Sequence, residues 1–121
     1  MDRKQELGSL KCELRAKLDN MIDKGISNEE LGLFHLLERC MAVFNRTVEF
    51  SSDKYIEVRM PELLEEMLDR MDNECEWALT DFQHYAGEHD LKPNDDYFYD
   101  GMKRAMEIVS ETVTKAVQKN E

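Results

Sequence analysis

The sequence is poor in cysteine and has no long apolar run. Its three cysteines, at positions 12, 40 and 75, form an odd set without a CxxC pair, which argues against a disulfide framework and a zinc site. The best apolar run, residues 40–44, is far too short for a membrane span. The charged residues 1–4 lack the apolar stretch of a signal peptide. We therefore expect a protein of the reducing cytoplasm that does not enter a membrane.

Basic residues are also few. The chain has 16 Lys and Arg against 27 Asp and Glu, for a net charge of −11, and such a balance disfavours direct binding of nucleic acid. We find no glycine-rich phosphate loop, internal repeat, low-complexity tract or linker. The sequence predicts one domain spanning residues 1–121, without a cofactor and without direct contact to nucleic acid.

What the sequence does contain is helical periodicity. A stripe of apolar residues with steps of three or four predicts a first helix over residues 3–24; its members are Leu7, Leu10, Leu14, Leu18 and Met21. Ser27 and Glu30 have the spacing of a capping box, which predicts the start of a second helix. Apolar residues between Leu31 and Phe44 cover more than half of its helical wheel. This second helix is therefore expected to be the most buried element.

Two further helices follow in the pattern. Pro61 suits a first helical turn, and one apolar stripe predicts an unbroken third helix over residues 61–86, ended by Gly87. Asn94 can cap a fourth helix that continues nearly to the C-terminus. Residues 47–60 instead alternate between apolar and polar, which predicts either a short β-hairpin or an irregular excursion. The expected fold is an all-α bundle of about four helices with this excursion between the second and the third.

The charge is concentrated in one region. Residues 61–100 carry 13 acidic and 2 basic side chains, so they account for the whole net charge of −11. Six carboxylates gather on the third helix opposite its apolar stripe, and they are Glu62, Glu65, Glu66, Asp69, Asp72 and Glu76. Along about 21 Å of helix they place about one charge every 3.5 Å, close to the phosphate spacing along one DNA strand.

Two interpretations of this acidic face are open. The face can dock on a protein with a basic surface, including a basic groove meant for nucleic acid, as phage and mobile-element inhibitors that imitate nucleic acid do. It can also be a solvated face that serves solubility alone.

Trp77 departs from the pattern because it lies far from the apolar stripe of the third helix. Either residues 47–60 pack over it, or it is an exposed aromatic anchor for a partner. Small residues at Gly101, Ala105 and Ala116 near one edge of the fourth helix allow close approach of another helix, inside the bundle or across a homodimer.

Catalytic interpretations have less support in the sequence. Glu62, Glu65, Glu66 and Asp69 resemble the magnesium-binding carboxylate helix of all-α nucleotide pyrophosphohydrolases, which implies a metal-dependent nucleotide hydrolase as the enzyme alternative. The second acidic motif of that family is missing, since the fourth helix offers only Glu107 and Glu111 without the right companions.

A second acidic group with histidines could hold a divalent ion, although its spacing matches no known loop; its members are His84, Glu88, His89, Asp90, Asp95 and Asp96. His35 and Glu38, three residues apart on the second helix, are expected to make a surface contact. The sequence thus favours a small regulator or inhibitor that binds a macromolecule over an enzyme. Its predicted contact residues are Glu62, Glu65, Glu66, Asp69, Asp72, Glu76 and Trp77.

Overall fold

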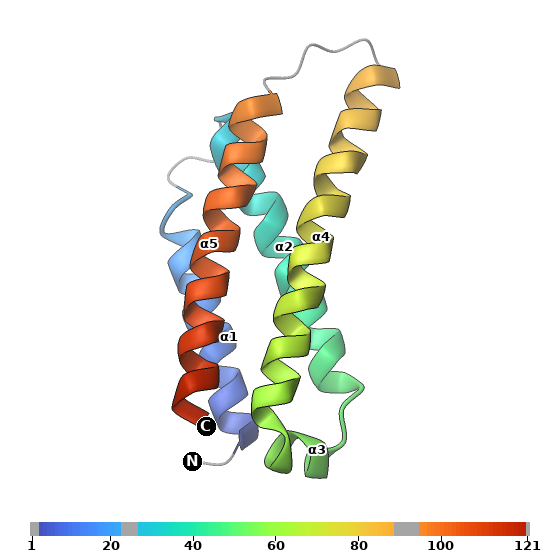
Figure 1. The fold of residues 1–121 in the computed structure, drawn as a ribbon. Coiled ribbons are helices and arrows are strands. Elements are labelled where there is room, and N and C mark those ends of the chain that lie inside the picture. Colours follow the sequence, from blue (N-terminus) through green and yellow to red (C-terminus); the bar gives the residue numbers. More distant parts are fainter. Residues whose placement is uncertain (1–2, 23–26, 89–94, 121) are drawn as a thin grey trace.

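A computed structural model describes residues 3–22, 27–88 and 95–120 of the chain (Figure 1). In this part of the chain the structure is all-α, with five helices and no strand. The helices are α1 (Arg3–Asp19), α2 (Asn28–Glu49), α3 (Asp53–Val58), α4 (Met60–Glu88) and α5 (Asp95–Asn120). The all-α prediction is confirmed, and the expected number of about four helices is corrected to five. Over the same residues, no helix has the length and apolar character that crossing a membrane requires.

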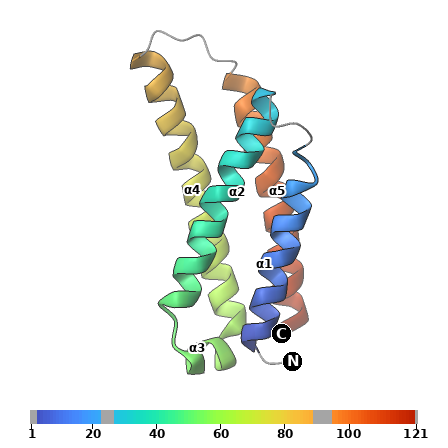
Figure 2. The ribbon, with the colours of Figure 1, turned by 180° about the vertical axis from the view of Figure 1, so that it is seen from behind.

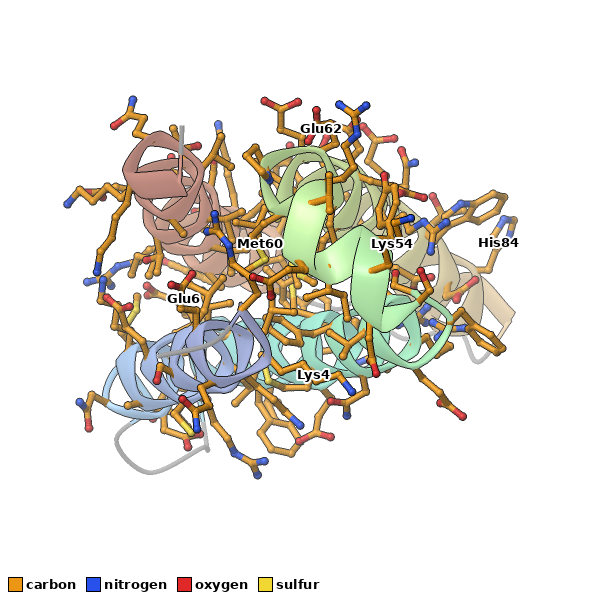
Figure 3. All side chains as sticks on the ribbon, turned by 90° about the horizontal axis from the view of Figure 1, so that it is seen from below. Lys4, Glu6, Lys54, Met60, Glu62 and His84 are labelled. Atoms are coloured by element: carbon orange, nitrogen blue, oxygen red, sulfur yellow. The ribbon has the colours of Figure 1, made fainter. Side chains whose placement is uncertain are left out.

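The longer helices are arranged in two layers. α4 and α5 lie side by side toward the viewer in Figure 1, and α1 and α2 lie behind them, as the reverse view in Figure 2 shows. The end-on view in Figure 3 separates the same two layers. α2 and α5 each pack against α1, α4 and one another. The α2 and α5 pair is therefore the centre of the fold, and the prediction that the second helix is central is confirmed.

The helix starts follow from local hydrogen bonds. The Ser27 hydroxyl accepts the backbone N–H of Glu30 at 3.1 Å and donates to its carboxylate at 2.9 Å, so the predicted cap of α2 is confirmed. α1 buries its four leucines as expected, but it ends at Asp19, earlier than the predicted residue 24. Residues 23–26 and the residues between α4 and α5, among them the predicted cap Asn94, lie outside the described part of the chain.

Residues 47–60 are mostly helical and contain no strand, so the prediction of a β-hairpin is wrong. The predicted irregular excursion is limited to residues 50–52 and Arg59, on either side of α3. α2 continues to Glu49, where the buried Thr47 hydroxyl donates to the Val43 carbonyl at 2.8 Å. Ser52 then caps α3 by accepting the backbone N–H of Tyr55 at 3.1 Å. Ile56 and Met60 are buried four residues apart, which is helical spacing. The serines that suggested a hairpin turn include the cap of the next helix.

α4 is one unbroken helix, as its apolar stripe predicts. Leu64, Met67, Met71 and Ala78 are fully buried along it. Viewed end-on, Met60 lies among the helices at the start of α4, whereas Glu62 points outward (Figure 3). The first turns of α4 thus separate a core face from an outer face, and the carboxylates lie on the outer one.

Glycine determines how closely α2 and α5 approach. A Cβ atom at Gly32 would overlap the Phe98 carbonyl oxygen, and one at Gly101 would overlap the Glu29 carbonyl oxygen. Ala105 on the same edge of α5 is fully buried. Of the small residues predicted to allow close approach, Gly101 therefore serves the interior of this chain, with α2 as its neighbour.

Candidate interaction surface

The acidic α4 face is the outer surface of α4 that carries the six predicted carboxylates. All six are exposed, and they are Glu62, Glu65, Glu66, Asp69, Asp72 and Glu76. Two of them pair with arginines of their own segment: Glu62 with Arg59 at 3.4 Å and Glu66 with Arg70 at 2.6 Å. The other four make no ion pair with any described residue. The structure thus divides the face into a paired part and an unpaired part.

The division follows the sides of the helix. At 100° per residue, the four unpaired carboxylates lie about 40° to 100° around α4 from Leu68, on the edge that faces α5. On the opposite edge, Arg39 of α2 bonds Glu74 at 2.9 Å and Asp81 at 3.0 Å. The chain therefore uses its own arginines on the α2 side of α4 and leaves the α5 side of the helix unneutralised.

A groove runs beside these unpaired carboxylates, between α4 and α5. Its larger part has a volume of about 760 Å³, and a second hollow of about 390 Å³ shares Asp72, Lys103 and Met106 with it. Leu68 and Met106 line the larger part and are only partly buried. We refer to both parts together as the α4/α5 groove. It combines an apolar floor with a charged rim.

Trp77 lies on the other side of α4. Its side chain is 63% exposed, so residues 47–60 do not cover it. Of the two interpretations of Trp77, the structure agrees with an exposed aromatic side chain. Phe50, 81% exposed just after α2, lines the same hollow of about 370 Å³ as Trp77. Arg46 and Arg70 also line this Phe50/Trp77 hollow. Two large aromatic side chains are thus presented together beside arginines.

Sequence reasoning missed Phe50 and the groove floor. Phe50 belongs to the segment predicted to be a β-hairpin or an irregular excursion, whereas it directly follows the last turn of α2. Leu68, Leu79 and Met106 lie at the edges of the apolar stripes and are only partly buried. Two long stripes that face the same neighbour leave such edges uncovered where the helices meet, and this was the available signal.

The described residues provide little for catalysis. No group of three His, Cys, Asp or Glu side chains is placed to hold a metal ion in residues 3–22, 27–88 and 95–120. Glu111, which the sequence offers on α5 without the companions of a second acidic motif, pairs with Lys115 at 3.1 Å. Of the predicted histidine and carboxylate group, His84 is exposed. Its other members lie outside the described residues or have undescribed side chains.

His35 is partly buried against the Phe98 ring, with ring centroids 5.8 Å apart. Burial lowers the pKa of His35, the Arg39 charge lowers it further, and the Asp81 carboxylate opposes both. Glu38 stays exposed, and it forms no ion pair within the described ranges. The expected surface contact of His35 and Glu38 is replaced by packing of His35 between α2 and α5.

The thiols divide by exposure. Cys12 is exposed, whereas Cys40 and Cys75 are buried. Burial raises the pKa of Cys40 to about 12, and burial with the nearby Asp72 and Glu76 raises that of Cys75 to about 11. Both buried thiols stay protonated at neutral pH and are poor nucleophiles.

Comparisons with family models, curated proteins and solved structures find no match. The function is therefore argued from the geometry of the acidic α4 face, the α4/α5 groove and the Phe50/Trp77 hollow.

Proposed function

We propose that this chain is an interaction protein, a small regulator or inhibitor that binds a protein partner with a basic surface through the acidic α4 face. The observation that carries the proposal is the set of exposed carboxylates without ion pairs in the described structure: Glu65, Asp69, Asp72 and Glu76. Clustered like charges repel one another, and a basic partner would relieve that repulsion on binding.

The spacing of the carboxylates supports a more specific partner. Over residues 62–76 of α4 the six carboxylates follow one another at about 4.2 Å along the helix axis on average, which is comparable with the spacing of about 3.4 Å between phosphates along one DNA strand. A protein whose basic groove normally holds nucleic acid is a partner that this face fits. Binding would be steered by charge and would weaken as salt screens it.

Trp77 is the proposed anchor at the other edge of the face. A large aromatic side chain that is exposed in the free chain gains most when a partner covers it. We expect Trp77→Ala to weaken partner binding by about tenfold or more while changing the free energy of unfolding by no more than about 0.5 kcal/mol. The free thiols, Cys12 among them, support a reducing compartment such as the cytoplasm as the place of action.

A charge-reversal experiment tests the proposal. The triple variant Glu65→Lys, Asp69→Lys and Asp72→Lys changes three of the four unpaired carboxylates. Its matched control changes three exposed carboxylates of α2 and α3 by the same total charge; these are Glu38, Glu49 and Glu57. Each protein is used to capture partners from an extract of the source cells, and mass spectrometry identifies the captured proteins. The affinity of each variant for the purified partner is then measured at low and at high salt.

We expect the wild type and the control to capture the same basic proteins in a salt-sensitive way, and the α4 triple variant to lose them. Capture of the same proteins by the α4 triple variant with unchanged affinity would overturn the proposal, since the acidic α4 face would then be a solvated face only.

A further inference from the structure

The α4/α5 groove lies on an uncovered face of the molecule. α4 and α5 run side by side in Figure 1 with no described helix in front of them, and α1 and α2 lie on their other side in Figure 2. The residues that line the groove on α5 extend from Tyr99 to Gln118. At 1.5 Å per residue this is about 28 Å, or about five helical turns. The groove therefore has the length of a typical partner helix.

The floor of the groove is apolar and the rim is acidic. Leu68, Leu79 and Met106 are partly buried side chains that still border open space. Five carboxylates line the groove, and they are Asp69, Asp72, Glu76, Glu107 and Glu111. The lining also holds Lys103 and Lys115, and Lys115 already pairs with Glu111 at 3.1 Å. The rim thus keeps an excess of negative charge above an apolar floor.

We propose that the α4/α5 groove is the docking site for an amphipathic basic helix of the protein partner, an inference that rests on the proposed function. The helix presents its apolar stripe to Leu68, Leu79 and Met106. Lysines or arginines on the two flanks of that stripe meet the carboxylates of α4 and α5. This is the helix-in-groove mode of recognition, in which apolar anchors at i, i+3, i+4 and i+7 fill the groove.

The negative charge of the chain favours a basic helix over a second copy of the chain as the occupant of the groove. Each copy carries a net charge of −11, and residues 61–100 contribute all of it. Two acidic α4 faces brought together would repel one another, whereas a basic helix neutralises the rim. The α4/α5 groove is therefore expected to bind a basic partner.

A designed peptide tests the groove directly. The probe is an 18-residue helix, about five turns long, with leucine at i, i+3, i+4 and i+7 and lysine elsewhere. One control peptide has the same composition in an order that forms no apolar stripe. The other control has glutamate in place of lysine. We expect the probe to bind at least about tenfold more tightly than either control in isothermal titration calorimetry.

Variants of the protein identify the surface that binds the probe. Met106→Gln makes the groove floor polar without changing charge, and Ser110→Phe occupies groove space. The matched control is Ile108→Gln, a partly buried position of the same helix that does not line the groove. We expect each groove variant to bind the probe about tenfold more weakly than the wild type does, and the control variant to bind it with unchanged affinity. Circular dichroism shows which variants fold, and either groove variant alone suffices.

Trp77 provides an internal reporter because it is the single tryptophan of the chain. At 100° per residue it lies about 180° around α4 from Leu68. A probe in the α4/α5 groove leaves Trp77 fluorescence unchanged. A probe that shifts this fluorescence binds at the Phe50/Trp77 hollow instead and overturns the inference.

The remaining outcomes separate the inference from the proposed function. If the scrambled peptide binds as well as the probe and Met106→Gln and Ser110→Phe have no effect, the groove is not the docking site. The charge-reversal triple variant would still lose both peptides in that case, so the acidic α4 face would stand. If the probe does not bind while partner capture depends on the α4 carboxylates, the inference fails and the proposed function survives.

Discussion

Two glycines show how single residues control the packing of this chain. Gly32 of α2 faces the Phe98 carbonyl, and Gly101 of α5 faces the Glu29 carbonyl. In both cases the neighbour is backbone, which cannot rotate away as a side chain can. The position of α5 against α2, and with it one wall of the α4/α5 groove, therefore depends on the absence of two Cβ atoms.

We expect Gly32→Ala and Gly101→Ala each to lower the free energy of unfolding by about 2–3 kcal/mol, because the added methyl group forces the two central helices apart. Gly8→Ala is the matched control, since a Cβ at Gly8 of α1 meets no atom within 4 Å. That change should raise stability by up to about 1 kcal/mol through helix propensity. Urea denaturation measures all three. Equal effects at the three positions would show that α2 and α5 are not in close contact.

His35 makes stability depend on pH. The groups that face it are Arg39 on its own helix, Asp81 from α4 and the Phe98 ring from α5. Its pKa in the folded chain lies below the ordinary value of 6.5, so the unfolded chain binds the proton more strongly. Stability from this group is complete above pH 6.5 and is lost as pH falls from 6.5 toward the folded pKa.

Urea denaturation at pH about 7.5 and about 5.5 tests this dependence. The wild type should lose more stability across that interval than His35→Gln, in which the proton-binding group is absent. Identical losses would mean that His35 is as free to protonate in the folded chain as in the unfolded one.

Among the helices, α4 was the easiest to predict and the segment before it the hardest. The stripe from Leu64 to Ala78 repeats over many turns, and such a long signal allows one interpretation only. Residues 47–60 contain short apolar steps that fit a strand and a helix alike. Burial of Ile56 and Met60 against the rest of the core favours the helix. This tertiary contact cannot be predicted from the pattern of one chain segment.

The acidic α4 face was predictable and the groove beside it was not. Carboxylates opposite an apolar stripe must point outward, so their exposure follows from the sequence. The two ion pairs within the face join residues three and four positions apart, Arg59 with Glu62 and Arg70 with Glu66, so they too follow from the sequence. The pairing of Glu74 with Arg39, 35 positions away, does not. The α4/α5 groove likewise depends on how two helices cross.

Arg39 is the main polar link between α2 and α4. Its guanidinium group bonds Glu74 and Asp81. The side chain of Arg39 is 30% exposed and that of Glu74 is 27% exposed, so water screens this pair only in part. We expect Arg39→Gln to cost about 1–2 kcal/mol of stability, because Asp81 loses its cation and Glu74 keeps only the longer pair with Arg46 at 4.0 Å. Arg104→Gln is the comparison, since Arg104 makes a more exposed link to Glu29 at 3.0 Å and should cost below about 1 kcal/mol. Thermal unfolding at low salt measures both, and a larger loss for Arg104→Gln would contradict this assignment.

For the molecule as a whole, the charge is unevenly balanced. Carboxylates on the α2 side of α4 are neutralised within the chain, whereas those on the α5 side repel one another in water. Like charges three or four residues apart on a helix destabilise it. A surface that lowers the stability of its own fold is typical of binding sites, where stability and function are in competition.

This competition gives a prediction that needs no partner. Neutralising three of the four unpaired carboxylates with Glu65→Gln, Asp69→Asn and Asp72→Asn removes about five like-charge neighbour pairs on α4. The free energy of unfolding should rise by about 1–2 kcal/mol at low salt, and the gain should shrink at high salt as screening weakens the repulsion in the wild type. Urea denaturation, which uses an uncharged denaturant, measures the gain in stability at both salt concentrations.

The control neutralises Glu38, Glu49 and Glu57, which lie near the cations Arg39, Arg46 and Lys54 in sequence, and should bring no gain in stability. A loss of stability in the α4 variant would mean that these carboxylates have stabilising partners within the chain, and the acidic α4 face would then lose the observation on which its proposed function depends.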